Sequence, residues 1–142
     1  MKVSKDFDLR EFVPPEIWRR FGRNSRWFIR QDVIDLAQFY RDYFDAAVRV
    51  NDWHYGGDFT MRGFRPPDAD VGASLSQHKF GNAFDCDIEG FTADVVREEI
   101  LNNPEPFKDA GLTTLESGRF APTWVHSDLR TTALDDILVV GV

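Results

Sequence analysis

Two segments carry the residues best suited to chemistry, since each places a histidine close to a carboxylate. SQHKFGNAFD at 76–85 contains His78 and Asp85, and TWVHSDLR at 123–130 contains His126 and Asp128. A histidine beside one carboxylate is a weak metal signal, but two imidazoles and one carboxylate leave a tetrahedral zinc ion with an open position for water. Zinc in such a site lowers the pKa of its bound water to about 7 and polarises a carbonyl oxygen. The residue types therefore predict a hydrolytic site with one Zn2+ ion.

Length and composition indicate one folded domain. The 142 residues suit a single core, and the 42% hydrophobic content includes 13 Phe, 4 Trp and 3 Tyr. The formal net charge of -7 makes nucleic acid and anionic membranes poor partners, because such surfaces are bound mainly through clusters of Lys and Arg. We therefore expect a monomer that binds neither nucleic acid nor membranes.

The start of the chain and its cysteine content bear on the cellular compartment. The first residues, MKVSKDFDLREF, are charged and lack the apolar core of a secretory signal, and no segment approaches membrane-spanning length. Cys86 is the only cysteine, which fits a reducing compartment and excludes both an internal disulfide and a zinc site dominated by thiolates. We expect synthesis in the cytoplasm, so that a target outside the membrane would require release by another route.

Hydrophobic periodicity predicts a single α+β domain over 1–142, with a helical part at about 1–47 and a metal-site core at about 48–131. The sheet is expected to be largely antiparallel, with helices packed on one face. Helices are predicted at 15–22, at about 30–46 and at about 92–102, where the apolar stripe comprises Val95, Val96, Ile100 and Leu101. Strands are predicted at 48–53, 59–65, 83–90, 112–117, 123–130 and 137–142, and an ordered loop at 66–77 is expected to deliver His78.

Alternation along two of these strands suggests which side chains meet. A strand at AFDCDIEG would bury Phe84, Cys86 and Ile88 and turn Asp85 and Asp87 to the opposite face. In the later strand, one face carries Trp124, His126, Asp128 and Arg130. The alternation alone leaves either Asp85 or Asp87 as the carboxylate that approaches the metal.

The two segments resemble the paired signatures of the M15 family of zinc peptidases. Residues 76–85 fit SxHxxGxAxD and residues 124–128 fit WxHxD, and the resemblance runs from about Asn51 to Arg130. The family includes D-alanyl-D-alanine carboxypeptidases and phage or bacterial endopeptidases that cut peptidoglycan stem peptides, and it shares its fold with the Hedgehog signalling domain. The resemblance implies a fold of this type, hydrolysis of a peptidoglycan peptide, and His78, Asp85 and His126 as the zinc ligands.

The resemblance also implies residues that contact the substrate. RGFRPP is similar to a family segment whose arginine binds the substrate or steadies the oxyanion, which favours Arg65 over Arg62. A guanidinium suits both a terminal carboxylate and the charge that develops on a tetrahedral intermediate. Ser76 is expected to hydrogen-bond within the loop and to line the substrate site, without acting as a nucleophile. Trp124 is expected to shield the zinc or flank the cleft.

The general base departs from the family pattern. Many members carry an acid three positions before the second zinc histidine, where this chain has Thr123, which cannot accept a proton from water at neutral pH. Glu116 shares a face with His126 if the two strands pair antiparallel with even-numbered residues opposite even-numbered ones. Asp128 is the second candidate, either as the base or as a hydrogen-bond partner that orients an imidazole.

Two functional classes follow from these residues. The first is a zinc metallopeptidase of cell-wall lytic or carboxypeptidase type, in the manner of an endolysin, encoded by a phage or its host and released by lysis or delivered in a virion. The second is a binding module that keeps the fold and the metal but cleaves nothing, which the missing acid at Thr123 motivates. The residues leave open which peptide bond would be cut.

Overall fold

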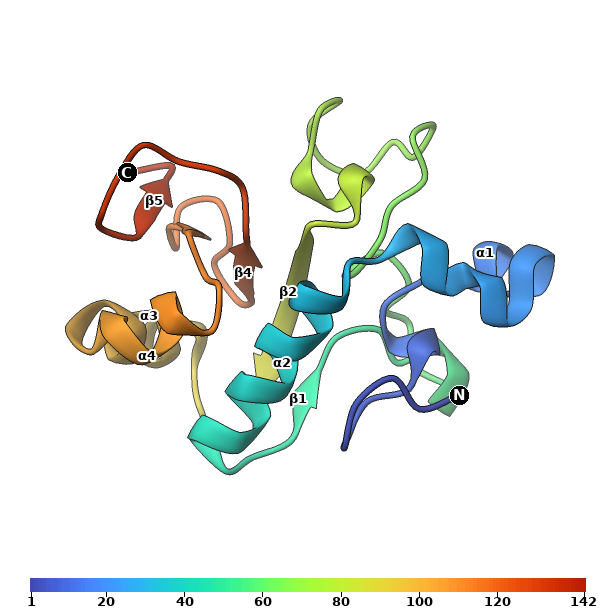
Figure 1. The fold of residues 1–142 in the computed structure, drawn as a ribbon, viewed down its shortest axis with the longest axis horizontal. Coiled ribbons are helices and arrows are strands. Elements are labelled where there is room, and N and C mark those ends of the chain that lie inside the picture. The colour runs from blue at the N-terminus through green and yellow to red at the C-terminus, as the bar shows by residue number, and fades with distance from the viewer.

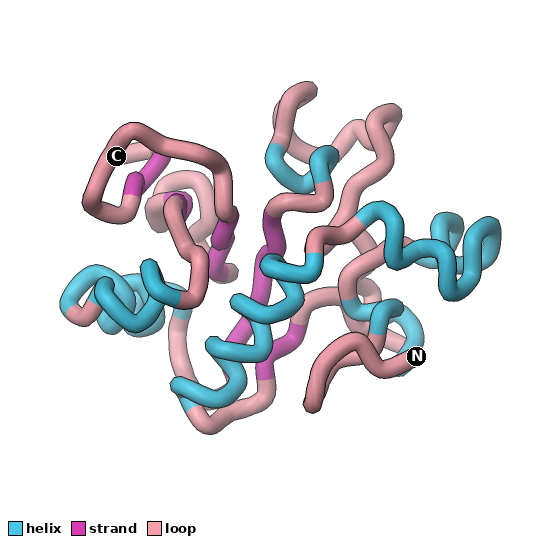
Figure 2. Tube along the Cα trace, in the orientation of Figure 1, coloured by secondary structure: helices cyan, strands magenta, loops and turns pink.

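A five-stranded sheet of order β1-β2-β4-β3-β5 lies at the centre of the computed structural model, which describes residues 1–142 (Figures 1 and 2). Neighbouring strands pair antiparallel except β3 and β5, which are parallel. The strands are β1 (Val48–Arg49), β2 (Ala83–Ile88), β3 (Thr114–Glu116), β4 (Val125–Asp128) and β5 (Leu138–Val140). The helices are α1 (Pro15–Phe21), α2 (Gln31–Phe44), α3 (Ala93–Asn102) and α4 (Pro104–Asp109). The mixed, largely antiparallel single domain agrees with the sequence prediction.

Local chemistry explains where the helices begin and end. α1 begins at Pro15, whose missing N–H is tolerated in a first turn, and ends before Gly22 at a φ of 53°. α3 begins after Thr92, whose hydroxyl accepts a hydrogen bond from the amide of Val95. The predicted helices at 15–22, 30–46 and 92–102 are thus confirmed to within two residues. No helix has both the length and the apolar character needed to cross a membrane.

The central pair β2 and β4 has one face for the core and one for polar side chains. Phe84 lies opposite Ser127 and Cys86 opposite Val125, and this face packs against α2, which runs along β2 in Figure 1. The ring of Tyr40 on α2 lies 5.4 Å from that of Phe84, and its hydroxyl is 2.6 Å from Oγ of Ser127. The opposite face therefore carries the acidic and imidazole side chains of the same two strands.

The segment 59–65 is not a strand, and the predicted strand at 48–53 is reduced to the two residues of β1. The amide of Arg62 donates to Oδ1 of Asn51, the amide of Phe64 donates to the carbonyl of Phe12, and no ladder forms. At Gly63 a Cβ atom would lie 2.3 Å from the carbonyl oxygen of Phe12. This close approach requires glycine and replaces regular strand pairing.

The apolar stripe predicted for α3 is wrong in part. Val96 and Ile100 are buried, whereas Val95 and Leu101 are 46% and 44% exposed. The sequence prediction also lacked α4, a single short helix that buries Phe107 against Tyr40 with ring centroids 5.7 Å apart. One buried side chain in six residues gives no detectable helical period.

We predict that Tyr40→Phe destabilises the fold by about 1 to 2 kcal/mol, because the buried Oγ of Ser127 loses its partner across the helix–sheet interface. Urea unfolding followed by circular dichroism measures the change. Tyr43→Phe is the matched control, because the Tyr43 hydroxyl bonds to Glu99 at the surface. Equal effects of the two variants would contradict the structural role given to Tyr40.

A second prediction concerns Glu11, which lies buried in the capping box with Asp8. Burial raises the pKa of Glu11 to about 7 from 4.5. The neutral side chain therefore stabilises the fold below pH 4.5, and this contribution is lost as the pH rises through 7. Relative to wild type, Glu11→Gln should gain about 1 to 3 kcal/mol of stability between pH 5 and pH 8. A difference in unfolding free energy that stays constant across this range would contradict the burial effect.

Candidate metal centre

Three side-chain atoms from distant parts of the sequence converge on one point. Nε2 of His78 lies 3.2 Å from both Oδ1 of Asp85 and Nδ1 of His126, and the latter two atoms are 2.9 Å apart. All three side chains are buried, with residue exposures of 1% for His78, 5% for Asp85 and 4% for His126. The group could hold a metal ion and comprises the three residues expected from the sequence.

The sheet register places two of the three residues. Asp85 on β2 lies directly opposite His126 on β4, so their side chains project from the same face. The third residue, His78, comes from the 3-10 helix Gln77–Phe80 (η4), which Ser76 caps by accepting a hydrogen bond from the amide of His78. Gly81 ends this helix at a φ of 65°, and a Cβ there would lie 2.1 Å from the carbonyl of Phe28. Glycine therefore allows the turn that returns the chain into β2.

The hydrogen bonds on the far side of each imidazole fix the tautomers. Nδ1 of His78 lies 2.8 Å from the carbonyl oxygen of Gly63, which can only accept, so this nitrogen carries the hydrogen. Nε2 of His126 lies 2.8 Å from Oδ2 of Asp128 and donates to that carboxylate. Each neutral ring then turns a lone pair toward Oδ1 of Asp85. With both rings neutral, these three atoms are acceptors within 3.2 Å of one another, and a cation among them would remove their mutual repulsion, so the donor set fits a metal.

Asp128 is the fully buried partner of His126. Oδ1 accepts from the amide (3.1 Å) and Nε (2.8 Å) of Arg130, and Oδ2 accepts from the second nitrogen of its guanidinium fork at 2.5 Å. Burial opposes ionisation, but the hydrogen bonds from Arg130 and His126 lower the pKa of Asp128 to about 2. Asp128 is thus a buried anion that orients His126.

A proton competes with the metal for His126. Burial disfavours the charged ring, but hydrogen bonds to Asp128 and Asp85 raise the pKa of His126 to about 9 in the metal-free protein. Burial also opposes the charge of Asp85, yet the two histidines hold its pKa well below the usual range. Metal binding must therefore displace a proton from His126.

Arg65 lies beside the metal centre but is engaged by the protein. Its Nε donates to the carbonyl of Met61 at 2.8 Å, and a guanidinium nitrogen donates to Oδ2 of Asp85 at 3.1 Å. The remaining nitrogen packs so closely on Gly72 that a Cβ there would lie 2.6 Å away. Burial lowers the pKa of Arg65 without removing its charge. Arg65 therefore holds Oδ2 of Asp85 in place and uses two of its five N–H donors, while its side chain also lines the cleft.

Glu116 reaches the centre from β3. Thr114 lies opposite Asp128 and Leu115 opposite Ser127, so the even-to-even register expected from the sequence is present and Glu116 faces His126. Oε1 of Glu116 is 3.3 Å from Nδ1 of His126, and the Glu116 side chain keeps 28% of its surface exposed. It is the carboxylate of the group that solvent can reach most easily.

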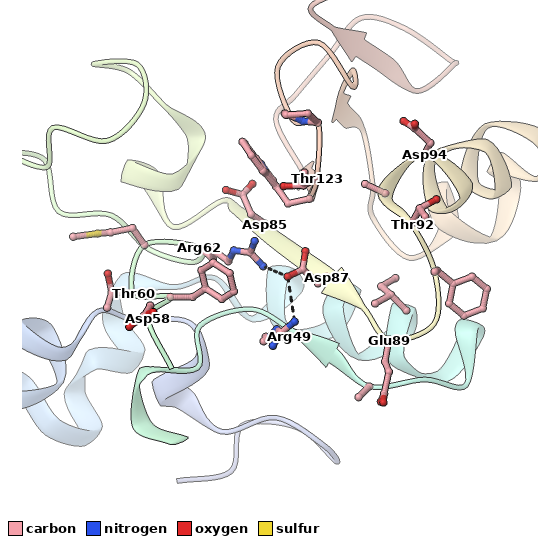
Figure 3. A pocket seen from close by; sticks show the side chains of 18 of the residues that line it. Arg49, Asp58, Thr60, Arg62, Asp85, Asp87, Glu89, Thr92, Asp94 and Thr123 are labelled. Atoms are coloured by element: carbon pink, nitrogen blue, oxygen red, sulfur yellow. Dashed lines mark hydrogen bonds and ion pairs between the residues drawn. The ribbon is translucent and has the colours of Figure 1, made fainter. Parts of the chain in front are cut away.

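An open cleft of about 1370 Å³ meets the centre at Asp85 (Figure 3). Trp124, Thr123 and Arg65 line it near Asp85. Ser76 does not line the cleft, and its hydroxyl caps η4, so its predicted contact with substrate stays a prediction. Arg62 also lines the cleft, and its guanidinium donates to Oδ2 of Asp87 at 2.8 Å rather than to one of the three candidate metal ligands.

Comparisons with protein-family models, with curated proteins and with solved structures found no match to this chain. The peptidase family that the two motifs resemble therefore stays a prediction.

We predict that Asp128→Asn lowers zinc affinity about 10- to 100-fold, because the amide cannot hold the His126 tautomer as the carboxylate does. Competition with a chromogenic chelator measures the affinity, and circular dichroism checks the fold. Asp109→Asn, at an exposed position at the end of α4, is the charge-matched control. Wild-type affinity in a folded Asp128→Asn protein would show that Asp128 does not orient the ligand.

Proposed function

We propose that the chain is a zinc-dependent peptidase of M15 type, with a Hedgehog/DD-peptidase-like fold, that hydrolyses a peptide bond in peptidoglycan stem peptides. The observation that carries the proposal is the convergence of three lone pairs, from His78, Asp85 and His126, at the edge of an open cleft. The motif around these residues supplies the substrate class, because it resembles that of enzymes acting on such peptides.

The ligand types favour zinc among the common metals. Two imidazoles and one carboxylate suit zinc in a catalytic site, whereas calcium and magnesium prefer sites made of oxygen atoms. The thiol of Cys86 is fully buried on the core face of β2 and is therefore no ligand. Zinc bound here would supply a Lewis acid that lowers the pKa of water and polarises the substrate carbonyl.

Glu116 is the residue best placed to move protons. It lies within 3.3 Å of His126 Nδ1 and keeps contact with solvent, so it can take a proton from the attacking water and pass it to the leaving amine. Asp128 is unsuited to this step, since both of its oxygens accept hydrogen bonds and none of its surface is exposed. Thr123 lines the cleft and stands where many family members carry an acid. We assign that role to Glu116, which reaches His126 from β3.

One observation favours a second candidate, a metal-containing binding module without activity. The 3.3 Å between Glu116 and His126 is close to the distances between the three ligand atoms themselves. A carboxylate at that distance suits a fourth ligand as well as a base. Four protein ligands would close the site and leave no position for water.

Glu116→Gln separates the two candidates. For a peptidase, the variant should keep one zinc per chain while turnover falls about 100-fold or more, because only the proton acceptor is lost. Zinc is measured by plasma mass spectrometry, and turnover by mass spectrometry of muropeptides released from purified peptidoglycan. Glu105→Gln on the exposed side of α4 is the control and should match wild type in both.

Other outcomes of this experiment have distinct meanings. Loss of zinc in Glu116→Gln, together with an inactive wild-type protein, would favour the closed binding module. A fully active Glu116→Gln would move the base elsewhere. Wild-type protein that retains no zinc, or full activity in His126→Ala, would exclude the peptidase.

A further inference from the structure

Five of the 17 basic residues of the chain lie in one short segment, 15–30, which comprises α1, the 3-10 helix Gly22–Phe28 (η2) and the two residues that follow. These five residues are Arg19, Arg20, Arg23, Arg26 and Arg30. The only acid in the segment is Glu16, so the segment has a net charge of +4 in a chain whose net charge is -7. We call residues 15–30 the arginine segment.

Most guanidinium groups of the arginine segment have no carboxylate partner. Arg30 alone is paired, with Asp32 at 2.6 Å. The other four arginines form no ion pair, and three of them are exposed, namely Arg19, Arg20 and Arg23. Four cations within eight residues repel one another, and an anion placed against them would relieve that repulsion. The segment is therefore suited to an anionic partner.

A tryptophan ring projects into solvent among these arginines. Trp27 is 71% exposed, although tryptophan is buried over most of its surface in a typical protein. The ring is supported from behind, since it meets the edge of Phe21 at 6.5 Å between centroids, and Phe21 meets Phe28 at 4.8 Å. Phe28 in turn stacks at 5.2 Å on Phe64, which is buried. Trp27 is thus the outer end of a row of rings that leads into the core.

The arginine segment lies apart from the metal centre. In Figure 1, α1 projects beyond the sheet at the end of the molecule opposite α3, α4 and β5. None of the residues 15–30 lines the cleft at Asp85. A second exposed ring is close by, because Phe80 is 61% exposed and precedes Gly81, whose carbonyl accepts a hydrogen bond from the amide of Arg30. The segment can therefore meet a partner while the cleft stays open.

An anionic lipid surface matches this combination of side chains better than nucleic acid does. Tryptophan rings favour the headgroup level of a bilayer, and guanidinium groups bind phosphate bidentately. Proteins that bind single-stranded nucleic acid instead use a groove with several aromatic platforms, whereas Trp27 is the one exposed aromatic residue within 15–30. A flat surface also meets only the projecting end, because charges farther away than a Debye length of about 8 Å are screened.

We propose that the arginine segment docks the protein on an anionic lipid surface, with its four unpaired arginines on the lipid phosphates and Trp27 inserted among the headgroups. The net charge of the whole chain argues against such a partner, but a surface meets only the charge that is local to the contact. The inference goes beyond the proposed peptidase and does not depend on it, because the segment contains none of the three metal-site residues.

Co-sedimentation of the whole chain with vesicles tests the proposal. The probes are vesicles of phosphatidylcholine alone and vesicles of phosphatidylcholine mixed with phosphatidylglycerol. The protein should bind the anionic vesicles about 10-fold or more tightly than the neutral ones, and added salt should weaken this binding. Equal binding to both kinds of vesicle, or binding to neither, would overturn the proposal.

Two variants test the residues, and each has a matched control. Arg23→Gln should lower the affinity for anionic vesicles about 5-fold, as expected for one arginine at such a surface, whereas Arg119→Gln removes an exposed arginine after β3 and should match wild type. Trp27→Ala should also lower the affinity about 5-fold or more, whereas Leu134→Ala, at a residue 56% exposed, should not. Circular dichroism checks the fold of each variant. Wild-type affinity in Arg23→Gln or Trp27→Ala, or an equal loss in the controls, would overturn the proposal.

Fluorescence anisotropy with a labelled single-stranded DNA oligonucleotide separates the lipid surface from nucleic acid. At a salt concentration where the protein binds anionic vesicles, we expect the oligonucleotide to bind at least about 10-fold more weakly, because it offers no layer into which Trp27 can insert. Tighter binding to the oligonucleotide than to the vesicles, lost in Arg23→Gln, would overturn the proposal and assign the segment to nucleic acid.

Discussion

Asp85 on β2 and His126 on β4 lie directly opposite each other, and this pairing determines the position of the other charged groups at the centre. Because side chains alternate along a strand, a slip of β2 by one residue would turn Asp85 into the core and bring Phe84 to the polar face. The core side of the same strand pair resists such a slip, since Tyr40 packs on Phe84 and bonds to Ser127. Fold stability and metal geometry therefore depend on one register.

The buried polar side chains of the centre are surrounded by further groups that hydrogen-bond to them. The carbonyl of Gly63 accepts a hydrogen bond from Nδ1 of His78, and the carboxylate of Asp128 accepts one from Nε2 of His126. Arg65 donates to Oδ2 of Asp85. Arg130 in turn neutralises Asp128. Each outer contact removes one alternative orientation of an inner side chain, so that Nε2 of His78 and Nδ1 of His126 point toward Asp85 before a cation binds. Such preorganisation lowers the entropic cost of binding the metal.

Much of this centre follows from alternation and spacing, and some of it does not. The placement of Asp85, His126, Asp128 and Glu116 on one face is predictable, because strand parity is a local property of the sequence. The contact of His78 with the carbonyl of Gly63 is not, since a backbone acceptor leaves no trace in residue types. The roles of the two arginines also required the structure. Arg62 and Arg65 both lie in the short segment RGFR, which the sequence suggested to be part of a strand. The segment 59–65 is irregular instead, and it pairs Arg65 with Asp85 and Arg62 with Asp87.

X-ray absorption spectroscopy of the zinc-loaded protein at neutral pH tests the central claim most directly. If His78, Asp85 and His126 hold the ion, the spectrum should show one zinc per chain in a four-coordinate shell of nitrogen and oxygen at about 2.0 to 2.1 Å, with the outer-shell scattering of two imidazoles. A sulfur ligand, a shell without imidazole scattering, or six oxygen neighbours would contradict the assignment of this site.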